Sequence, residues 1–224
     1  MEFDRFAGDY EKILDRSVAA SGEESAYFAE YKARYLARVV PPALGGRVLD
    51  FGCGVGLLAG FLARYLAPAR LDGFDVSEES VRRVDPALAG RGVFTADAGR
   101  LANDYGLIVA ANVLHHVDRA ERQETIRSLA GRLAPRGRLA LFEHNPANPV
   151  TRRVVERCPF DDGVELLPPK ESSRYLETAG LRVVRRDYIV FLPRALAWLR
   201  PLEPRLAWLP LGAQYAMIGE KEER

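Results

Sequence analysis

Short apolar runs alternate with segments of helical periodicity through the middle of the chain. The apolar runs have the length of strands and end in glycine or an acidic residue, and the segments between them carry apolar residues on one helical face. The predicted strands are 47–52, 71–76, 92–97, 105–112 and 138–144, and the clearest predicted helices are 55–66 and 120–133. This alternation is typical of a mostly parallel sheet with helices on both faces, so we predict a doubly wound α/β fold.

The two ends of the chain depart from this alternation. The N-terminal segment is predicted to be helical and holds seven aromatic side chains, which suits a lid over the ligand-binding edge of a sheet. Near the other end, a stretch rich in proline and leucine separates two further predicted strands, 181–190 and 213–221. We therefore predict one domain over residues 1–224, made of a lid at 1–40, a ligand-binding core at 41–150, and C-terminal strands at 151–224 with an apolar cap at 191–212.

The composition narrows the class of protein. Hydrophobic residues make up 48% of the 224 residues and charged residues 28%, which suits a globular core. With a net charge of +1 and no basic stripe, we expect no nucleic-acid partner. Two cysteines cannot build a disulfide framework, the N-terminus lacks a signal peptide, and no apolar run approaches the ~20 residues of a membrane span. We expect a cytoplasmic protein.

A glycine-rich loop follows the first predicted strand. Gly52, Gly54 and Gly56 occupy alternate positions, which lets the backbone turn tightly and approach a ligand at the start of the next helix. Asp75, at the end of the second predicted strand, can accept both hydroxyls of a ribose. The spacing G-x-G-x-G differs from the G-x-G-x-x-G of a pyrophosphate site, so a nucleoside fits better than a dinucleotide. A plain strand-to-helix turn and a nicotinamide-dependent oxidoreductase stay as alternatives.

With these motifs, the chain from about Arg47 to Asn145 resembles the class I S-adenosylmethionine-dependent methyltransferases. The resemblance implies a Rossmann-like sheet of seven strands, with the seventh inserted antiparallel beside the sixth. It also implies S-adenosylmethionine as cofactor. By position in the family motifs, the cofactor-binding residues are Asp50, Gly52, Cys53, Gly54, Gly56, Asp75, Val76, Asp97, Ala98 and Asn112. Cys53 is expected to be a packed thiol rather than a nucleophile.

All three histidines of the chain follow predicted strands, at the edge where an acceptor pocket should lie. His115 and His116 follow the fourth strand and His144 follows the fifth. Methyl transfer from a sulfonium is an in-line displacement, and it needs a base only when the acceptor must lose a proton. We predict His144 first, and then the pair, as a base or orienting group. The alternative is that these histidines bind only the backbone.

Two further expectations concern the same pocket. Tyr10 lies in a segment that resembles the lid helix of family members, where an aromatic ring can stack near the sulfonium or can simply pack on the core. No metal site is expected, because no nearby pair of acids completes an oxygen-rich magnesium site.

The resulting prediction is a bacterial enzyme that methylates oxygen or nitrogen of a small molecule in a biosynthetic pathway. Three alternatives stay open: a lipid-linked acceptor contacted by the stretch at 191–212, a non-catalytic protein that binds S-adenosylmethionine, and the oxidoreductase. Contact with a membrane is possible but is not the favoured interpretation. We expect either a monomer or a homodimer.

Overall fold

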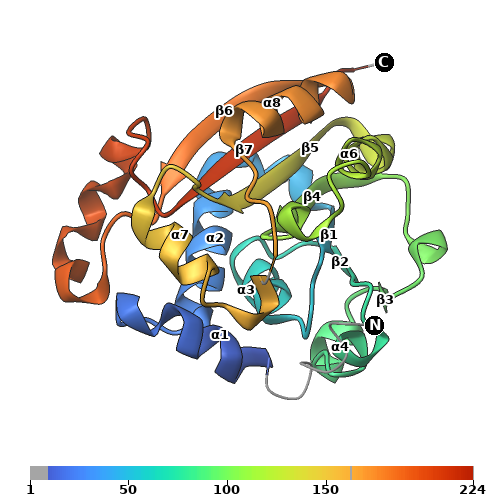
Figure 1. Cartoon of the computed structure of the whole chain (residues 1–224). Helices are drawn as coiled ribbons and strands as arrows, with labels where there is room; N and C mark the ends of the chain where they lie inside the picture. Colours follow the sequence, from blue (N-terminus) through green and yellow to red (C-terminus); the bar gives the residue numbers. More distant parts are fainter. Residues whose placement is uncertain (1–9, 162, 224) are drawn as a thin grey trace.

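A central seven-stranded sheet organises the computed structural model, which describes residues 10–161 and 163–223 (Figure 1). The strands are β1 (Arg47–Phe51), β2 (Arg70–Phe74), β3 (Phe94–Thr95), β4 (Tyr105–Ala111), β5 (Leu133–His144), β6 (Leu181–Ile189) and β7 (Gln214–Lys221). Their order is β3-β2-β1-β4-β5-β7-β6. The first five strands are parallel, and β7 runs antiparallel to both of its neighbours. The predicted α/β fold, including the inserted antiparallel strand, is confirmed.

Helices cover both faces of this sheet. They are α1 (Tyr10–Val18), α2 (Ser25–Val39), α3 (Leu57–Tyr65), α4 (Glu78–Arg82), α5 (Pro86–Ala89), α6 (Arg122–Gly131), α7 (Pro149–Val155) and α8 (Pro169–Thr178). Single turns of 3-10 helix lie between them: η2 (Ala19–Ser21), η3 (Pro42–Gly45), η4 (Ala98–Arg100), η5 (Leu114–His116) and η6 (Pro159–Asp161), with a longer η7 (Arg194–Leu206).

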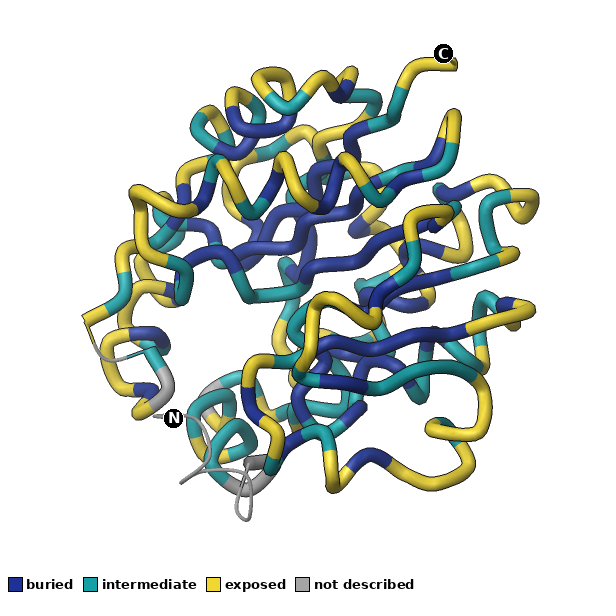
Figure 2. Tube along the Cα trace, turned by 90° about the vertical axis from the view of Figure 1, so that its right-hand side faces the viewer, coloured by how far each residue is buried: buried dark blue, intermediate teal, exposed yellow. Residues whose placement is uncertain are grey.

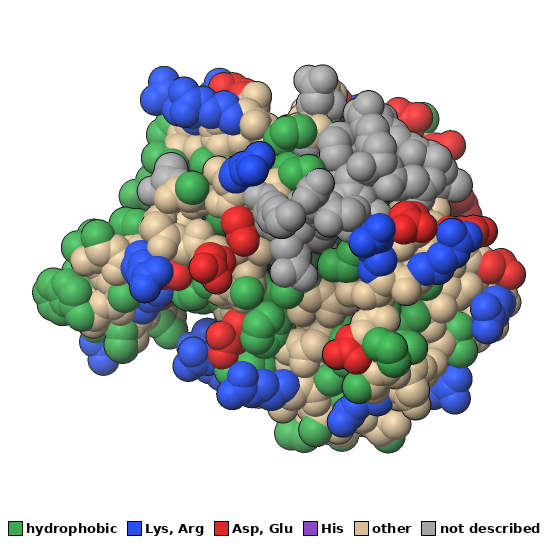
Figure 3. Space-filling view, turned by 90° about the horizontal axis from the view of Figure 1, so that it is seen from below, with side chains coloured by type: hydrophobic (Ala, Val, Ile, Leu, Met, Phe, Trp, Pro, Cys, Tyr) green, Lys and Arg blue, Asp and Glu red, His purple; other side chains and the backbone are tan. Residues whose placement is uncertain are grey.

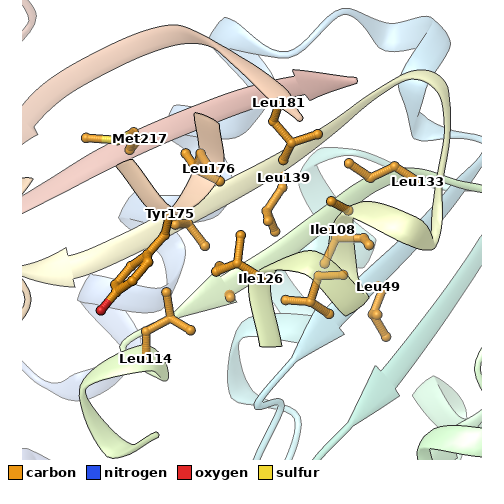
Figure 4. Packing of buried hydrophobic residues seen from close by; sticks show 14 of the residues in the cluster. Leu49, Ile108, Leu114, Ile126, Leu133, Leu139, Tyr175, Leu176, Leu181 and Met217 are labelled. Carbon is orange, nitrogen blue, oxygen red and sulfur yellow. The ribbon is translucent and has the colours of Figure 1, made fainter. Parts of the chain in front are cut away.

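Successive residues of each central strand feed two separate hydrophobic clusters, because side chains alternate between the faces of a sheet. Leu49 and Ile108 pack with α6 and α8, as Figure 4 shows for the first cluster. Their neighbours Val48 and Leu107 pack with α2 and α3 on the opposite face. The central strands are therefore buried on both sides, as the tube in Figure 2 shows.

Element ends differ from the predicted ones where turns are tight. The predicted helix 120–133 stops at Gly131, and β5 already begins at Leu133 instead of Arg138. Residues 133–137 pair with β4 through a register shift between Tyr105 and Leu107, so they belong to β5. At the opposite edge, β3 is only two residues long.

The predicted lid divides into two parts. In α2, Ala33 and Leu36 are fully buried against the sheet, so this helix belongs to a covering layer. In α1, Leu14 and Val18 line the cavity described below. The side chain of Tyr10, the first residue of α1, lies outside the described residues.

The stretch between β6 and β7 forms a lobe around η7 that projects from the sheet (orange-red in Figure 1). Glu203 anchors it: this carboxylate is 2% exposed and accepts hydrogen bonds from the backbone of Phe191 and Leu192 and from the hydroxyl of Tyr31. Trp198 and Trp208 are each 75% exposed, and Figure 3 shows hydrophobic side chains at the outer end of the lobe. Within the described ranges, no helix is both long and apolar enough to cross a bilayer.

Candidate active site

The glycine loop has the backbone that its sequence predicted. Gly52, Gly54 and Gly56 have φ angles of 79°, 51° and 89°, in the left-handed region that other residues rarely adopt. Gly52 has a second constraint, because a Cβ built there would lie 2.3 Å from Cγ2 of Val113. The loop backbone thus packs directly against the end of β4, and α3 begins immediately after it.

Asp75 ties the loop to the end of β2. Its Oδ2 accepts a hydrogen bond from the N–H of Gly54 at 2.8 Å, and its Oδ1 accepts one from the N–H of Ser77 at 2.9 Å. Val76, next in the chain, is 48% exposed. The carboxylate therefore lies at the carboxyl edge of the sheet, beside the loop.

Two buried oxygens near the loop have no hydrogen-bond partner among the described residues. Asp50 is 1% exposed on β1 and its Oδ2 is unpaired; at the end of β4, Oδ1 of Asn112 is unpaired as well. Burial, and then the charge of Asp75, raises the pKa of Asp50 to about 7, although a backbone hydrogen bond from Ala59 opposes this. Buried polar atoms normally have partners, so these atoms point to a polar ligand.

The remaining predicted cofactor residues lie on either side of this centre. Asp97 and Ala98 are exposed after β3, and Oδ1 of Asp97 accepts a hydrogen bond from the N–H of Gly99 at 2.8 Å, capping η4. Cys53 is buried, and burial, followed by the charges of Asp50 and Asp75, raises the pKa of its thiol well above the ordinary value. A neutral buried thiol agrees with a packing role.

The three histidines meet at the ends of β4 and β5. The rings of His115 and His116 are centred 4.1 Å apart, and those of His115 and His144 are 5.3 Å apart. Nδ1 of His115 lies 2.6 Å from Oε2 of Glu143, whose other oxygen accepts a hydrogen bond from the N–H of Leu114. The structure thus brings all three predicted histidines together, with a buried glutamate as a fixed partner.

A second carboxylate, Asp161 at the end of η6, closes the cluster. Its Oδ1 lies 3.3 Å from Nε2 of both His115 and His116. Two acids, Glu143 and Asp161, therefore lie beside the histidines, although with two imidazoles in the group they do not make an oxygen-rich magnesium site. Glu143 directly precedes His144, but Asp161 comes from a separate segment that reaches the cluster only through the fold.

Burial and nearby charges give the three imidazoles very different pKa values. For His115, burial disfavours the imidazolium, but the charge of Glu143 and the hydrogen bonds to Asp161 and Glu143 outweigh it and raise the pKa to about 9. For His144, burial and then the charge of His115 lower the pKa to about 3, and His116 is lowered to about 4 for the same reasons. His144 is therefore neutral at pH 7, which suits it to accept a hydrogen bond and weakens it as a base.

A cavity of about 460 Å³ extends from the glycine loop to His144. Gly52, Cys53, Asn112, His144 and Asp161 line it, and most of its other lining residues are apolar. These apolar walls come from α1, α2, α7 and the segment that leads into η7. The cavity therefore has a polar floor at the carboxyl edge of the sheet and apolar sides above it.

Lys32 is a further cavity residue that sequence analysis did not single out. It lies on α2 and is 4% exposed; burial lowers its pKa to about 8, against the opposing influence of Glu143. The sequence held one signal of this burial: Lys32 is one of few lysines in the chain, and it follows an aromatic run among apolar residues.

Comparison with known proteins identifies the chemistry. Residues 24–186 match a family model described as a methyltransferase domain, which covers more than half of the chain. The chain belongs to the methyltransferase domain family. This methyltransferase uses S-adenosylmethionine as its cofactor, and the assignment replaces the oxidoreductase alternative.

Relatives of the methyltransferase differ in their acceptors. It is 28% identical over 173 residues to a ubiquinone biosynthesis O-methyltransferase of Sinorhizobium fredii, an alignment that covers 70% of this chain and 68% of the relative. It is 33% identical over 79 residues to ribosomal RNA small subunit methyltransferase C of Vibrio vulnificus, which covers 33% of this chain but only 23% of that relative. The structure of magnesium protoporphyrin IX methyltransferase from Synechocystis PCC 6803 with bound SAH has a TM-score of 0.66 at 19% identity, covering 98% of this chain and 96% of the other.

The residues present in the methyltransferase fit its cofactor. A left-handed glycine loop leaves room for close backbone approach, and the unpaired oxygens of Asp50 and Asn112 offer acceptors for a group that donates hydrogen bonds. Gly52 and Asn112 line the cavity, and Asp50 is buried on β1, two residues before Gly52.

Proposed function

We propose that the protein methylates an oxygen, or else a nitrogen, of a small and largely apolar acceptor molecule in the 460 Å³ cavity. The observation that carries this proposal is the continuity of the cavity, whose lining includes both the glycine loop and His144. Walls of mainly apolar side chains favour an apolar acceptor and exclude water from the reacting atoms.

For the cofactor half of the site, we propose roles by position. The carboxylate of Asp75 accepts the ribose hydroxyls, and the exposed edge formed by Val76, Asp97 and Ala98 meets the adenine. The loop from Gly52 to Gly56, with the unpaired oxygens of Asp50 and Asn112, holds the amino acid part. When bound there, S-adenosylmethionine supplies a methyl group on a positively charged sulfur.

For the acceptor half, the fixed cluster supplies orientation rather than a strong base. A neutral His144 accepts a hydrogen bond from an acceptor hydroxyl, while both ring nitrogens of His115 contact carboxylates, those of Glu143 and Asp161. Holding the acceptor atom in line with the methyl group is a large part of the acceleration in such a displacement. Lys32, a buried cation of the cavity wall, favours an acceptor oxygen that becomes more negative as its proton passes to His144.

The acceptor class can be tested by release of S-adenosylhomocysteine from S-adenosylmethionine. We expect turnover with small apolar phenols or hydroxylated rings, and none with small-subunit ribosomal RNA or intact ribosomal subunits. Methylation of the RNA and of none of the small molecules would contradict the proposal and favour the acceptor of the Vibrio vulnificus relative.

Substituting His144 tests the acceptor half of the site separately from the cofactor half. We expect His144→Ala to lower kcat/KM for the best acceptor by about 100-fold, because His144 orients the acceptor and receives its proton late in the transfer, when the oxygen that gains the methyl group has become strongly acidic. The affinity for S-adenosylhomocysteine should stay within about twofold of the wild type, since the cofactor contacts are on the loop side. Calorimetry and initial rates measure the two quantities, and an equal loss in both would contradict the assignment of His144 to the acceptor.

A lipid-linked acceptor is a second candidate, favoured by the two exposed tryptophans of the η7 lobe. Phe191, Leu192 and Pro193 lead from the cavity into this lobe, and tryptophan is enriched at membrane interfaces. This candidate predicts that the protein floats with vesicles of phosphatidylcholine and phosphatidylglycerol, and that the double variant Trp198→Ala/Trp208→Ala loses most of that binding while it still binds S-adenosylhomocysteine. Wild-type protein that stays at the bottom of the gradient would remove the lipid-linked acceptor.

A further inference from the structure

We propose that His115, His144 and Asp161 form a binding site for a divalent first-row transition-metal ion where His144 and Asp161 line the cavity. One ligand atom from each residue lies within 4.8 Å of those of the other two. The three residues come from η5, the end of β5 and η6, so the fold assembles the group from segments far apart in the sequence.

The orientation of His115 supports a ligand role. Its Nδ1 lies 2.6 Å from Glu143, which is held in turn by the N–H of Leu114. Histidines that bind metals commonly donate their other ring N–H to a carboxylate, which fixes the tautomer and turns the second nitrogen toward the ion. Here that second nitrogen, Nε2, faces Asp161 at 3.3 Å.

Charge balance supports the same conclusion. Glu143 and Asp161 bring two carboxylates to a region where their side chains are 1% and 10% exposed. A divalent cation would balance both without protonating an imidazole. The competing arrangement is a protonated His115 bridging the two acids with Lys32 nearby, and the experiment below separates the two.

The donor set indicates which ions fit. Two imidazole nitrogens and one carboxylate oxygen suit Zn²⁺, Fe²⁺, Mn²⁺ or Co²⁺ better than Mg²⁺, which prefers oxygen ligands. Because His144 and Asp161 line the cavity, the remaining coordination positions face the space proposed for the acceptor. Resting on the proposed function, the bound ion would take the lone pair of His144 and so replace the hydrogen bond from the acceptor hydroxyl; it would bind the acceptor oxygen itself and make its proton easier to lose to solvent.

Cobalt provides a direct probe of the site. The 224-residue protein is freed of metal with a chelator and titrated with Co²⁺, whose visible absorption reports nitrogen and oxygen coordination. Zn²⁺ is then added in competition. We expect one saturable site per chain. His144→Ala and Asp161→Asn should each weaken Co²⁺ binding by about 100-fold or more, and Glu143→Gln by about 10- to 100-fold, as loss of an outer-shell partner does elsewhere.

Cys158→Ser is the matched control, because Cys158 also lines the cavity and thiolates bind the same ions. It should leave the cobalt spectrum unchanged. Thermal unfolding of each metal-free variant shows whether it is folded. A wild-type protein with no saturable site for Co²⁺ or Zn²⁺ overturns the proposal, and so does binding that His144→Ala and Asp161→Asn leave intact.

Calorimetry with S-adenosylhomocysteine on the same samples distinguishes failure of the metal site from failure of the proposed function. Cofactor binding without metal binding overturns the metal site alone. Metal binding without methylation of any small molecule speaks against the proposed function and leaves the metal site standing.

Discussion

Replacing Asp75 with alanine is expected to weaken binding of S-adenosylhomocysteine by at least about 100-fold. The carboxylate accepts hydrogen bonds from the N–H groups of Gly54 and Ser77, so its loss frees the loop as well as removing the proposed ribose acceptor. Hydrogen bonds to a charged group contribute about 1.5–3 kcal/mol each, and every 1.4 kcal/mol is tenfold in affinity. Isothermal titration calorimetry measures the change.

Asp85→Ala is the matched control for this variant. It removes the same charge from an exposed helix cap, where Oδ1 of Asp85 accepts a hydrogen bond from the N–H of Ala87. We expect it to lose a little stability and no cofactor affinity. If Asp75→Ala bound S-adenosylhomocysteine as tightly as Asp85→Ala does, the assignment of the ribose site to Asp75 would be wrong.

Gly52→Ala is expected to destabilise the fold by about 2–4 kcal/mol, which combines left-handed strain with overlap in a packed contact. Its φ of 79° disfavours any side chain, and the new Cβ would lie 2.3 Å from Cγ2 of Val113. Because the loop must shift to relieve the overlap, affinity for S-adenosylhomocysteine should fall as well. Urea unfolding gives the free energy, and calorimetry gives the affinity.

Gly180→Ala separates the two contributions. This glycine has a φ of 81°, yet a Cβ added there meets nothing within 4 Å, so the variant measures the backbone strain alone. We expect it to cost about 1–2 kcal/mol and to leave cofactor binding intact. Adding Val113→Ala to Gly52→Ala should restore part of the lost stability; equal destabilisation by Gly52→Ala and Gly180→Ala would show that the contact with Val113 is unimportant.

Much of the sheet and of the cofactor side of the site could be predicted from the sequence, because strands, glycine loops and acids at strand ends leave local patterns. The contact between Asp75 and the glycine loop is one example, since both follow adjacent parallel strands whose carboxyl ends meet at one edge. His115, His116 and His144 are predictable for the same reason. Their proximity follows from strand order alone.

Asp161 and Lys32 could not be placed in this way, whereas Glu143 lies within the predicted strand 138–144. Asp161 lies on η6, after a helix and outside the strand alternation, and no periodicity places it against His115. Lys32 appears in a segment whose pattern suggests a surface lid, whereas packing of α2 on the sheet buries it. Burial of a charged side chain depends on tertiary packing, which a single sequence does not encode locally.

The turn after β5 has a consequence for how the protein is made. The side-chain amide of Asn145 donates to the carbonyls of Pro210 and Gly212, and its backbone N–H donates to Ala213, so the turn beside His144 is held by residues that precede β7. As a ribosome synthesises the chain from its N-terminus, β1 to β5 emerge well before these carbonyls do. The glycine loop can therefore form early, whereas the histidine side of the cavity is completed only when β7 inserts between β5 and β6.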